Sequence, residues 1–258
     1  MSEETVALRV KELRKYFGSV RAVDGVSFEL HEAEILGIVG PNGAGKTTLL
    51  NLISGVIKPD SGKVMTRIRG RMVDVTGWPP PKLSSIGIAR AFQVPNVFEG
   101  LSVLDNLRAA IIARNRLYRS ISKPYDGGLA GVDDEAWRLL EFVGLSDKYY
   151  VAARSLSHGE RKLLDIAIAL ALNPRILLLD EPTAGLGSQD KDLVVDLIKK
   201  FRAEQRKSVI VVEHDLDVVF SVSDRVLVMY DGRVLAIGPP DAVRADPRVR
   251  KLYLGEST

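Results

Sequence analysis

The chain of 258 residues contains no cysteine and only three histidines. The absence of cysteine excludes disulfide bonds, thiolate zinc sites and cysteine nucleophiles. Long apolar runs are missing too, because the best candidate, residues 166–172, is far shorter than the ~20 residues that span a bilayer. The first residues, Met1 to Glu4, are acidic where a signal peptide carries basic side chains. We therefore expect a cytosolic protein that depends on another chain for any action at a membrane.

A strong charge of one sign is also lacking. The chain carries 36 lysines and arginines against 33 aspartates and glutamates, a net charge of +3. So small an excess is compatible with nucleotide phosphates, nucleic acid or anionic lipid and does not identify a partner. No nucleic acid is among the partners that we expect for the chain. The length and an apolar share of 46% are compatible with one large domain that contains an inserted subdomain.

A glycine-rich loop between two apolar segments is the most informative feature of the chain. The residues before it, 34–39, are typical of a buried strand, and the residues after it, 49–55, have the apolar spacing of a helix closed by glycine. The loop fits the G-x-x-x-x-G-K-[ST] pattern of phosphate-binding loops and consists of Gly40, Pro41, Asn42, Gly43, Ala44, Gly45, Lys46, Thr47 and Thr48. A glycine turn that enters a helix by chance is the weaker interpretation.

The chemistry of such a loop follows from its backbone. Glycines allow N–H groups to point at phosphate oxygens, and the N-terminus of the helix adds a partial positive charge. Lys46 is expected to reach the β- and γ-phosphates, and the Thr47 hydroxyl is expected to help hold Mg²⁺. The loop therefore predicts a nucleoside triphosphate site.

The rest of the chain alternates between strand-like and helical segments. Residues 6–10 and 26–30 alternate in polarity like half-buried antiparallel strands. Residues 176–179 and 209–212 are uniformly apolar, like the central strands of a covered parallel sheet, and residues 190–206 are expected to form the crossover helix between them.

Residues 102–171 have mainly helical spacing, interrupted by a loop expected over residues 120–132. The proline run at residues 77–81 predicts a surface loop. Near the end of the chain, Asp231-Gly232 is typical of a hairpin turn.

Two carboxylates follow the apolar segment 176–179. At the carboxyl end of a parallel strand, Asp180 is positioned to hold Mg²⁺ and Glu181 to polarise the water that attacks the γ-phosphate. On its own, an Asp-Glu pair before Pro182 is more often a turn that ends a strand. The phosphate loop upstream favours the catalytic interpretation.

His214 and Gln93 are further candidates for the catalytic site. His214 follows the next apolar strand, so it should lie at the same sheet edge and contact the γ-phosphate, although a lone histidine is more often structural. Gln93 lies at the junction with the helical segment, where an amide can touch both a metal-bound water and a moving loop. On spacing alone, Gln93 is an ordinary polar residue.

The segment Leu156-Ser157-His158-Gly159-Glu160 resembles the L-S-G-G-Q signature loop of the ABC ATPases. Together with the phosphate loop, Gln93, the Asp-Glu pair and His214, it is similar to the family's complete order of motifs, over essentially the whole chain. The departures are His158 for a glycine, Glu160 for the glutamine, and Gly187 where many relatives carry aspartate or asparagine. These departures concern the contacts between two subunits.

The resemblance implies a head-to-tail pair of ATPase subunits, identical or different, around two ATP molecules. Ser157 and Gly159 of one subunit would contact the γ-phosphate held by the phosphate loop of the other. Gln93 would touch the metal site, so Gln93, Glu181 and His214 are the implied catalytic residues, with Thr47, Gln93 and Asp180 at Mg²⁺. Phe17 would stack on adenine; Tyr16 is its rival, and core packing is the alternative for either.

The implied fold is α/β: a P-loop NTPase core of the RecA-like type with a mixed sheet. It includes an N-terminal antiparallel β subdomain and an inserted helical subdomain. We expect one domain over residues 1–258, with the core formed by residues 1–87 and 166–258 and the helical subdomain by residues 88–165.

Within the family, residues 89–103 and the ending from Gly238 are similar to branched-chain amino acid importers. Urea or amide importers, lipid or lipopolysaccharide transport ATPases and iron–sulfur assembly ATPases are the alternatives. The expected partners are membrane permease subunits, which would place a short helix against residues 93–107, and indirectly a solute-binding protein. The resemblance thus implies a peripheral protein on the cytoplasmic face of the membrane.

Overall fold

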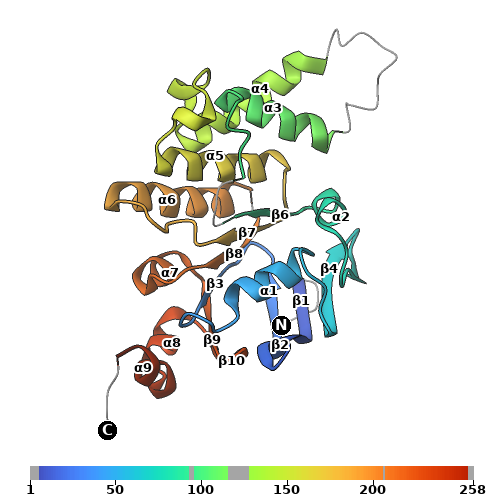
Figure 1. Cartoon of the computed structure of the whole chain (residues 1–258), viewed down its shortest axis with the longest axis vertical. Helices are drawn as coiled ribbons and strands as arrows, with labels where there is room; N and C mark the ends of the chain where they lie inside the picture. The colour runs from blue at the N-terminus through green and yellow to red at the C-terminus, as the bar shows by residue number, and fades with distance from the viewer. Residues whose placement is uncertain (1–5, 93–95, 116–127, 206, 255–258) are drawn as a thin grey trace.

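The computed structural model describes residues 6–92, 96–115, 128–205 and 207–254 (Figure 1). Within them, a six-stranded sheet has the order β10-β9-β3-β8-β7-β6. Its neighbouring strands are parallel except for the antiparallel pair β9 and β10, so the predicted mixed sheet is confirmed. The strands are β3 (Ile35–Val39), β6 (Ile88–Ala91), β7 (Ile176–Asp180), β8 (Ser208–Val212), β9 (Arg225–Tyr230) and β10 (Arg233–Gly238).

Both faces of this sheet are covered, which explains its uniformly apolar central strands. Successive side chains of a strand point to opposite faces, so Leu178 packs with α1 (Lys46–Ile53) on one face, whereas Leu177 and Leu179 join the helical cluster on the other. The crossover helix is α6 (Ser188–Gln205), as predicted. Three further helices pack near the β9–β10 end: α7 (Leu216–Val222), α8 (Pro240–Ala245) and α9 (Pro247–Leu254).

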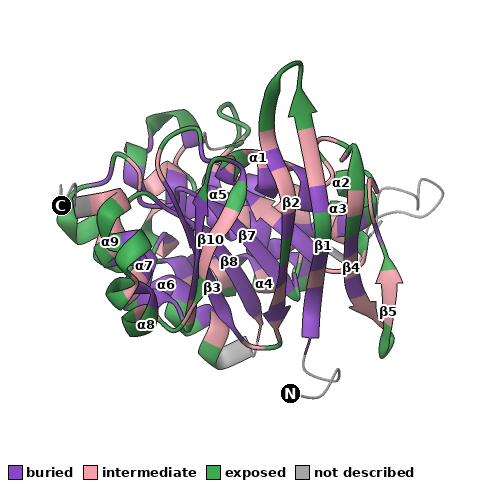
Figure 2. Ribbon diagram, turned by 90° about the horizontal axis from the view of Figure 1, so that it is seen from below, coloured by how far each residue is buried: buried purple, intermediate pink, exposed green. Residues whose placement is uncertain are grey.

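A second, antiparallel sheet lies over α1 and has the order β2-β1-β4-β5. Its first hairpin is longer than predicted, because pairing continues past the alternating segments to Phe17 opposite Val20. Figure 2 shows that the hairpin tip is exposed, whereas the rest of the two strands is mostly buried or half-buried, so the tip has no buried face that would require alternation. The strands are β1 (Val6–Phe17), β2 (Val20–His31), β4 (Ser61–Ile68) and β5 (Arg71–Asp74).

The helices α3, α4 and α5 gather at one end of the molecule (Figure 1). They are α3 (Val103–Arg114), α4 (Gly128–Val143) and α5 (His158–Ala171); short 3₁₀ turns at Ser146–Lys148 and Ala153–Ser155 lie between α4 and α5. The predicted loop over residues 120–132 is too long, because α4 begins at Gly128 despite its glycines. Burial of Val132, Ala136 and Leu140 on one face of α4 outweighs the low helix propensity of Gly128 and Gly131.

Two other expectations need correction. The predicted boundary of the helical subdomain at residue 88 is wrong, because β6 pairs with β7 in the core sheet, and α5 also runs through the boundary at residue 165. The surface loop predicted for residues 77–81 is also too long, because Pro80 is the first residue of the helix α2 (Pro80–Ser85). Proline is tolerated at this position because the first N–H groups of a helix make no hydrogen bond within the helix.

Candidate functional site

The predicted phosphate loop connects β3 to α1 at the carboxyl edge of the parallel sheet. The first turn of α1 has no side-chain cap and no acidic residue, so its N–H groups point into the loop without a competing carboxylate. Gly45, with φ of +96°, is required here, because a Cβ atom would collide with the carbonyl oxygen of Ala22. The backbone therefore forms a cradle for an anion.

Lys46 is buried within this cradle. Its Nζ donates hydrogen bonds to the carbonyl oxygens of Gly40, at 2.6 Å, and Pro41, at 3.0 Å. Burial lowers the pKa of Lys46, and the charges of Glu181 and Asp180 oppose that shift. The ammonium group is thus held over the loop by two carbonyl oxygens of the loop itself.

A cavity of about 460 Å³ lies above the loop. Glu181 and His214 reach it from the ends of β7 and β8, and His214 Nε2 contacts Glu181 Oε1. The structure thus brings the loop and two of the predicted catalytic residues together. The described lining consists of Val20, Ala22, Asn42, Gly43, Ala44, Gly45, Lys46, Thr47, Thr48, Glu181 and His214.

Asp180 is buried beside the loop. Its Oδ2 accepts a hydrogen bond of 2.6 Å from Arg90 Nη2, while its Oδ1 has no hydrogen-bond partner among the described residues. A buried, unpaired carboxylate oxygen is a suitable ligand for Mg²⁺ or for a water bound to it. Among the residues that the structure describes, no three His, Cys, Asp or Glu side chains cluster as a preformed metal cage. That is the usual situation for Mg²⁺ held with a nucleotide.

The signature loop does not line this cavity. Ser157 is the N-cap of α5 in a capping box: its hydroxyl accepts from Glu160 N at 3.2 Å, and Glu160 Oε2 accepts from Ser157 N at 2.8 Å. The departure at Glu160 therefore has a local structural role. The departure at His158 places its Nε2 3.4 Å from the carbonyl oxygen of Ala184, in the loop after the Asp-Glu pair.

Gly159 faces the first turn of α6. A Cβ atom at this position would lie 2.7 Å from Asp190 Oδ2, so a larger residue would require the exposed Asp190 side chain to move. Gly187 has open space around its Cα atom. Gln93 lies outside the described residues.

The two aromatic candidates for adenine stacking differ in their contacts. The Tyr16 hydroxyl donates to Asp24 Oδ1 at 2.7 Å, which fixes its ring against the hairpin. Phe17 is 51% exposed at the hairpin tip, and Val20, three positions further along the chain, lines the cavity. The exposure contradicts core packing for Phe17, whose ring is approached by Lys15 Nζ at 5.6 Å from its centre.

Three buried residues near the site escaped the sequence analysis. Arg90 bonds to Asp180, and Asp165 of α5 accepts hydrogen bonds of 2.9 Å from Phe92 N and Asn96 N, on either side of Gln93. Glu213, next to His214, accepts from the backbone and hydroxyl of Thr183. Each of these charged residues lies in or next to an apolar segment of the sequence, which indicates a buried charge. The sequence does not show which residue each charge bonds to.

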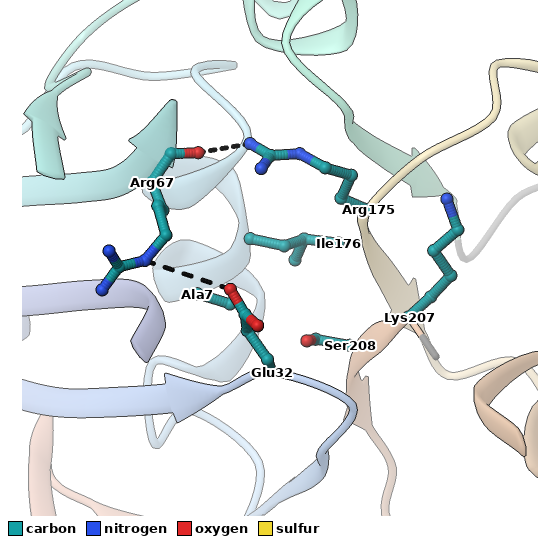
Figure 3. A pocket seen from close by; sticks show the side chains of 7 residues that line it. All are labelled: Ala7, Glu32, Arg67, Arg175, Ile176, Lys207 and Ser208. Carbon is teal, nitrogen blue, oxygen red and sulfur yellow. Dashed lines mark hydrogen bonds and ion pairs between the residues drawn. The ribbon is translucent and has the colours of Figure 1, made fainter. Parts of the chain in front are cut away.

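A second cavity, of about 240 Å³, lies at the opposite edge of the sheet (Figure 3). Its cationic groups are bound to separate protein acceptors: Arg175 donates to the carbonyl oxygen of Arg67, and Lys207 Nζ donates to Asn173 Oδ1 at 3.3 Å. Arg67 Nε faces Glu32 Oε1 at 4.0 Å. These groups do not converge on one point, in contrast to the N–H groups of the phosphate loop.

Fold and site together define a P-loop nucleotide-hydrolysing protein. Residues 23–184 match the family described as ABC transporter, and residues 233–257 match one described as branched-chain amino acid ATP-binding cassette transporter. The chain is 35% identical to the high-affinity branched-chain amino acid transport ATP-binding protein LivG of Salmonella typhimurium, over 97% of this chain and 98% of that protein. It is 34% identical to BraF of Pseudomonas aeruginosa, a protein of the same description, over the same shares.

Solved structures of ATP-binding cassettes are similar to this chain as well. An ATP-binding cassette of an ABC transporter in its ADP conformation is 33% identical, with a TM-score of 0.83 over 97% of this chain and 99% of that one. A dimeric cassette in a post-hydrolysis state with ADP and Pi is 28% identical, with a TM-score of 0.75 over 90% of this chain and 98% of that one. The chain belongs to the ABC transporter family, as an ATP-binding subunit with that family's ATPase activity. No helix within the described ranges is long and apolar enough to cross a membrane.

Proposed function

We propose that the chain is the ATPase subunit that energises import of branched-chain amino acids through membrane permease subunits. The relatives named above act in the transport of these amino acids, and the carboxyl-terminal segment matches a family of the same description. This support favours branched-chain amino acids over urea or amides, over lipid or lipopolysaccharide, and over iron–sulfur assembly.

Hydrolysis would depend on the contact between His214 and Glu181 at the mouth of the phosphate loop, which is the single observation that carries the mechanism. Glu181 would accept a proton from the attacking water, and His214 would orient Glu181 and contact the γ-phosphate. Lys46 would exchange its carbonyl partners for phosphate oxygens. Mg²⁺ would supply neutralisation of the phosphate charge, with Thr47, Asp180 and Gln93 as its protein ligands or water-mediated contacts.

The second half of each site would come from another ATPase subunit, since Ser157 and Gly159 lie outside the cavity of their own chain. The N-terminus of α5 would then face the γ-phosphate bound by the partner's loop. Gly159, which has no side chain and lies beside Asp190, would allow the partner subunit to approach closely at this point.

An exposed apolar patch, formed by Phe98, Leu101 and Tyr150, would receive the permease. These side chains are 63%, 41% and 75% exposed, respectively. Backbone hydrogen bonds from Val103 N to Val151 O and from Leu104 N to Tyr149 O bring their two segments together. A short amphipathic helix could bury this patch, which would hold the subunit on the cytoplasmic face of the membrane.

Replacing Glu181 by Gln tests the catalytic assignment. We expect ATP binding to persist and phosphate release to fall at least about 100-fold, because the amide cannot take up the proton. An ATP-bound dimer should accumulate on size-exclusion chromatography. Glu141→Gln, the same change on the exposed face of α4, is the matched control and should hydrolyse ATP normally. Normal phosphate release from the Glu181→Gln variant would remove Glu181 from this role.

The transport assignment is tested by recovery of partners from membranes with the chain as bait. We expect permease subunits that, when reconstituted with this chain, take up leucine, isoleucine or valine in the presence of ATP. Recovery of a scaffold protein without membrane spans in place of a permease would contradict the proposal.

A further inference from the structure

The guanidinium of Arg90 occupies a buried position between the phosphate-loop helix and Asp180. Arg90 lies on β6 and Asp180 at the end of the neighbouring strand β7. Their side chains are only 5% and 2% exposed, and Arg90 Nη2 lies 2.6 Å from Asp180 Oδ2. The pair is therefore shielded from the solvent that weakens surface ion pairs.

The same guanidinium is anchored to α1. Its Nη1 donates to Asn51 Oδ1 at 2.7 Å and to Ser54 Oγ at 3.0 Å, while Ser54 Oγ donates in turn to Leu50 O at 2.7 Å. On its other side, the Arg90 Cζ atom lies 4.8 Å from the centre of the Phe92 ring. The planar fork is thus fixed from α1 and from its own strand, which a lysine could not reproduce.

The consequence for Asp180 is an asymmetric carboxylate. Oδ2 is taken by Arg90, and the buried Oδ1 has no partner among the described residues. Because a carboxylate rotates as one unit, fixing Oδ2 also fixes the direction of Oδ1. The position of α1, which begins within the phosphate loop, then determines where the free oxygen points.

We propose that Arg90 is a positioning residue: it holds Asp180 by one oxygen, relative to α1, so that the other oxygen is presented to the Mg²⁺ of the nucleotide site. This inference rests on the proposed role of Asp180 at Mg²⁺. It assigns to Arg90 no contact with ATP, and it predicts a defect in the use of Mg²⁺ that is separate from nucleotide affinity.

The experiment measures equilibrium binding of a non-hydrolysable ATP analogue as a function of Mg²⁺ concentration, which does not depend on turnover. For Arg90→Met we expect the half-saturating Mg²⁺ concentration to rise about 10- to 100-fold, as for other residues that orient a metal ligand. Binding of the analogue in EDTA should stay within about twofold of the wild type, since Arg90 does not contact the phosphate loop. Arg175→Met, at the opposite edge of the sheet, is the matched control and should have no effect.

Two further variants separate geometry from charge and from misfolding. Arg90→Lys keeps the charge but not the fork, so it should be defective as well. Asn51→Ala removes one anchor and leaves the buried ion pair, so it should raise the Mg²⁺ requirement by a smaller factor, about threefold. Thermal unfolding followed by circular dichroism identifies any variant that fails to fold.

Asp180→Asn distinguishes the two levels of the proposal. If this variant keeps the wild-type Mg²⁺ dependence, the assignment of Asp180 to the metal is wrong and the role of Arg90 falls with it. A second outcome would overturn the inference on Arg90 alone. In that case Mg²⁺ no longer strengthens binding of the analogue to Asp180→Asn, but Arg90→Lys and Asn51→Ala have the half-saturating Mg²⁺ concentration of the wild type.

Discussion

Glu181 has a backbone conformation that few residues other than glycine adopt, with φ of +49°. A left-handed conformation costs roughly 1–2 kcal/mol for a residue with a Cβ atom. Two hydrogen bonds hold it: Glu181 N donates to Val212 O at 2.8 Å, and Lys162 Nζ donates to Glu181 O at 2.8 Å. In this left-handed conformation the chain leaves the direction of β7, and the Glu181 carboxylate contacts His214.

At the hairpin tip, we expect Phe17→Ala to weaken ATP binding about tenfold, equivalent to about 1.4 kcal/mol, through loss of base stacking. Binding of inorganic tripolyphosphate, which has no base, should not change. Isothermal titration calorimetry with both ligands measures the two effects.

Tyr16→Ala is the matched control for this prediction. Its ring is already tied to the hairpin by the bond to Asp24, so its loss should affect ATP binding less than the loss of Phe17. The reverse ranking would assign adenine stacking to Tyr16.

Among the elements, α5 connects most of the site. It begins at the signature loop, its Lys162 bonds to Glu181, and its Asp165 holds the backbone on both sides of Gln93. The capping box at Ser157 and Glu160 fixes where the helix starts. A displacement of α5 would therefore reach the Asp-Glu pair and the flanks of Gln93 at the same time.

Asp165 of α5 should make the stability of the folded protein depend on pH. Burial raises the pKa of Asp165 from 3.8 to about 6. The folded protein thus binds its proton more tightly than the unfolded chain, so this contribution to stability is present below pH 4 and is lost as the pH rises to about 6. Over that window the free energy of unfolding should fall by up to about 3 kcal/mol relative to Asp165→Asn, which has no titrating group.

Urea denaturation of both proteins at pH 4, 5, 6, 7 and 8 measures this difference in the free energy of unfolding, which should stay constant between pH 7 and 8. Asp133→Asn, on the exposed face of α4, is the control, because the Arg108 hydrogen bond lowers the pKa of Asp133 instead. A difference between wild type and Asp165→Asn that stays constant from pH 4 to 7 would contradict the prediction.

For the molecule as a whole, the apolar patch at Phe98 is the surface to test in an assembly. Replacement of a central aromatic contact by serine should weaken the complex with the permease by about 10- to 30-fold, because such anchors carry much of the binding energy. Co-purification of Phe98→Ser with the permease from detergent extracts measures the loss. Leu193→Ser, equally apolar and exposed on α6, should bind like the wild type; equal retention of both variants would exclude the patch.

The fold was largely predictable because its main elements have clear local patterns of apolar residues. Uniformly apolar segments indicated β7 and β8, and the spacing of residues 190–206 indicated α6. The errors occurred where packing outweighed local preference: α4 begins at glycine-rich residues because its buried face is apolar, and α2 starts within the proline run. At the exposed hairpin tip, the alternation that defines a strand is absent although the backbone pairing continues.

The sequence by itself determined the phosphate loop, the Asp-Glu pair, His214 and the signature loop, since each depends on neighbouring residues and on the backbone conformation they allow. Only the tertiary structure decided which partners these residues have. Arg90 and Asp180 are separated by 90 residues, and Phe92 and Asp165 by 73. A buried charge or N–H group is costly without a hydrogen-bond partner, so each of these groups bonds to a residue that lies close to it in the folded core. Which residues lie close is decided by the packing of β6, β7 and α5, and the local sequence does not contain that information.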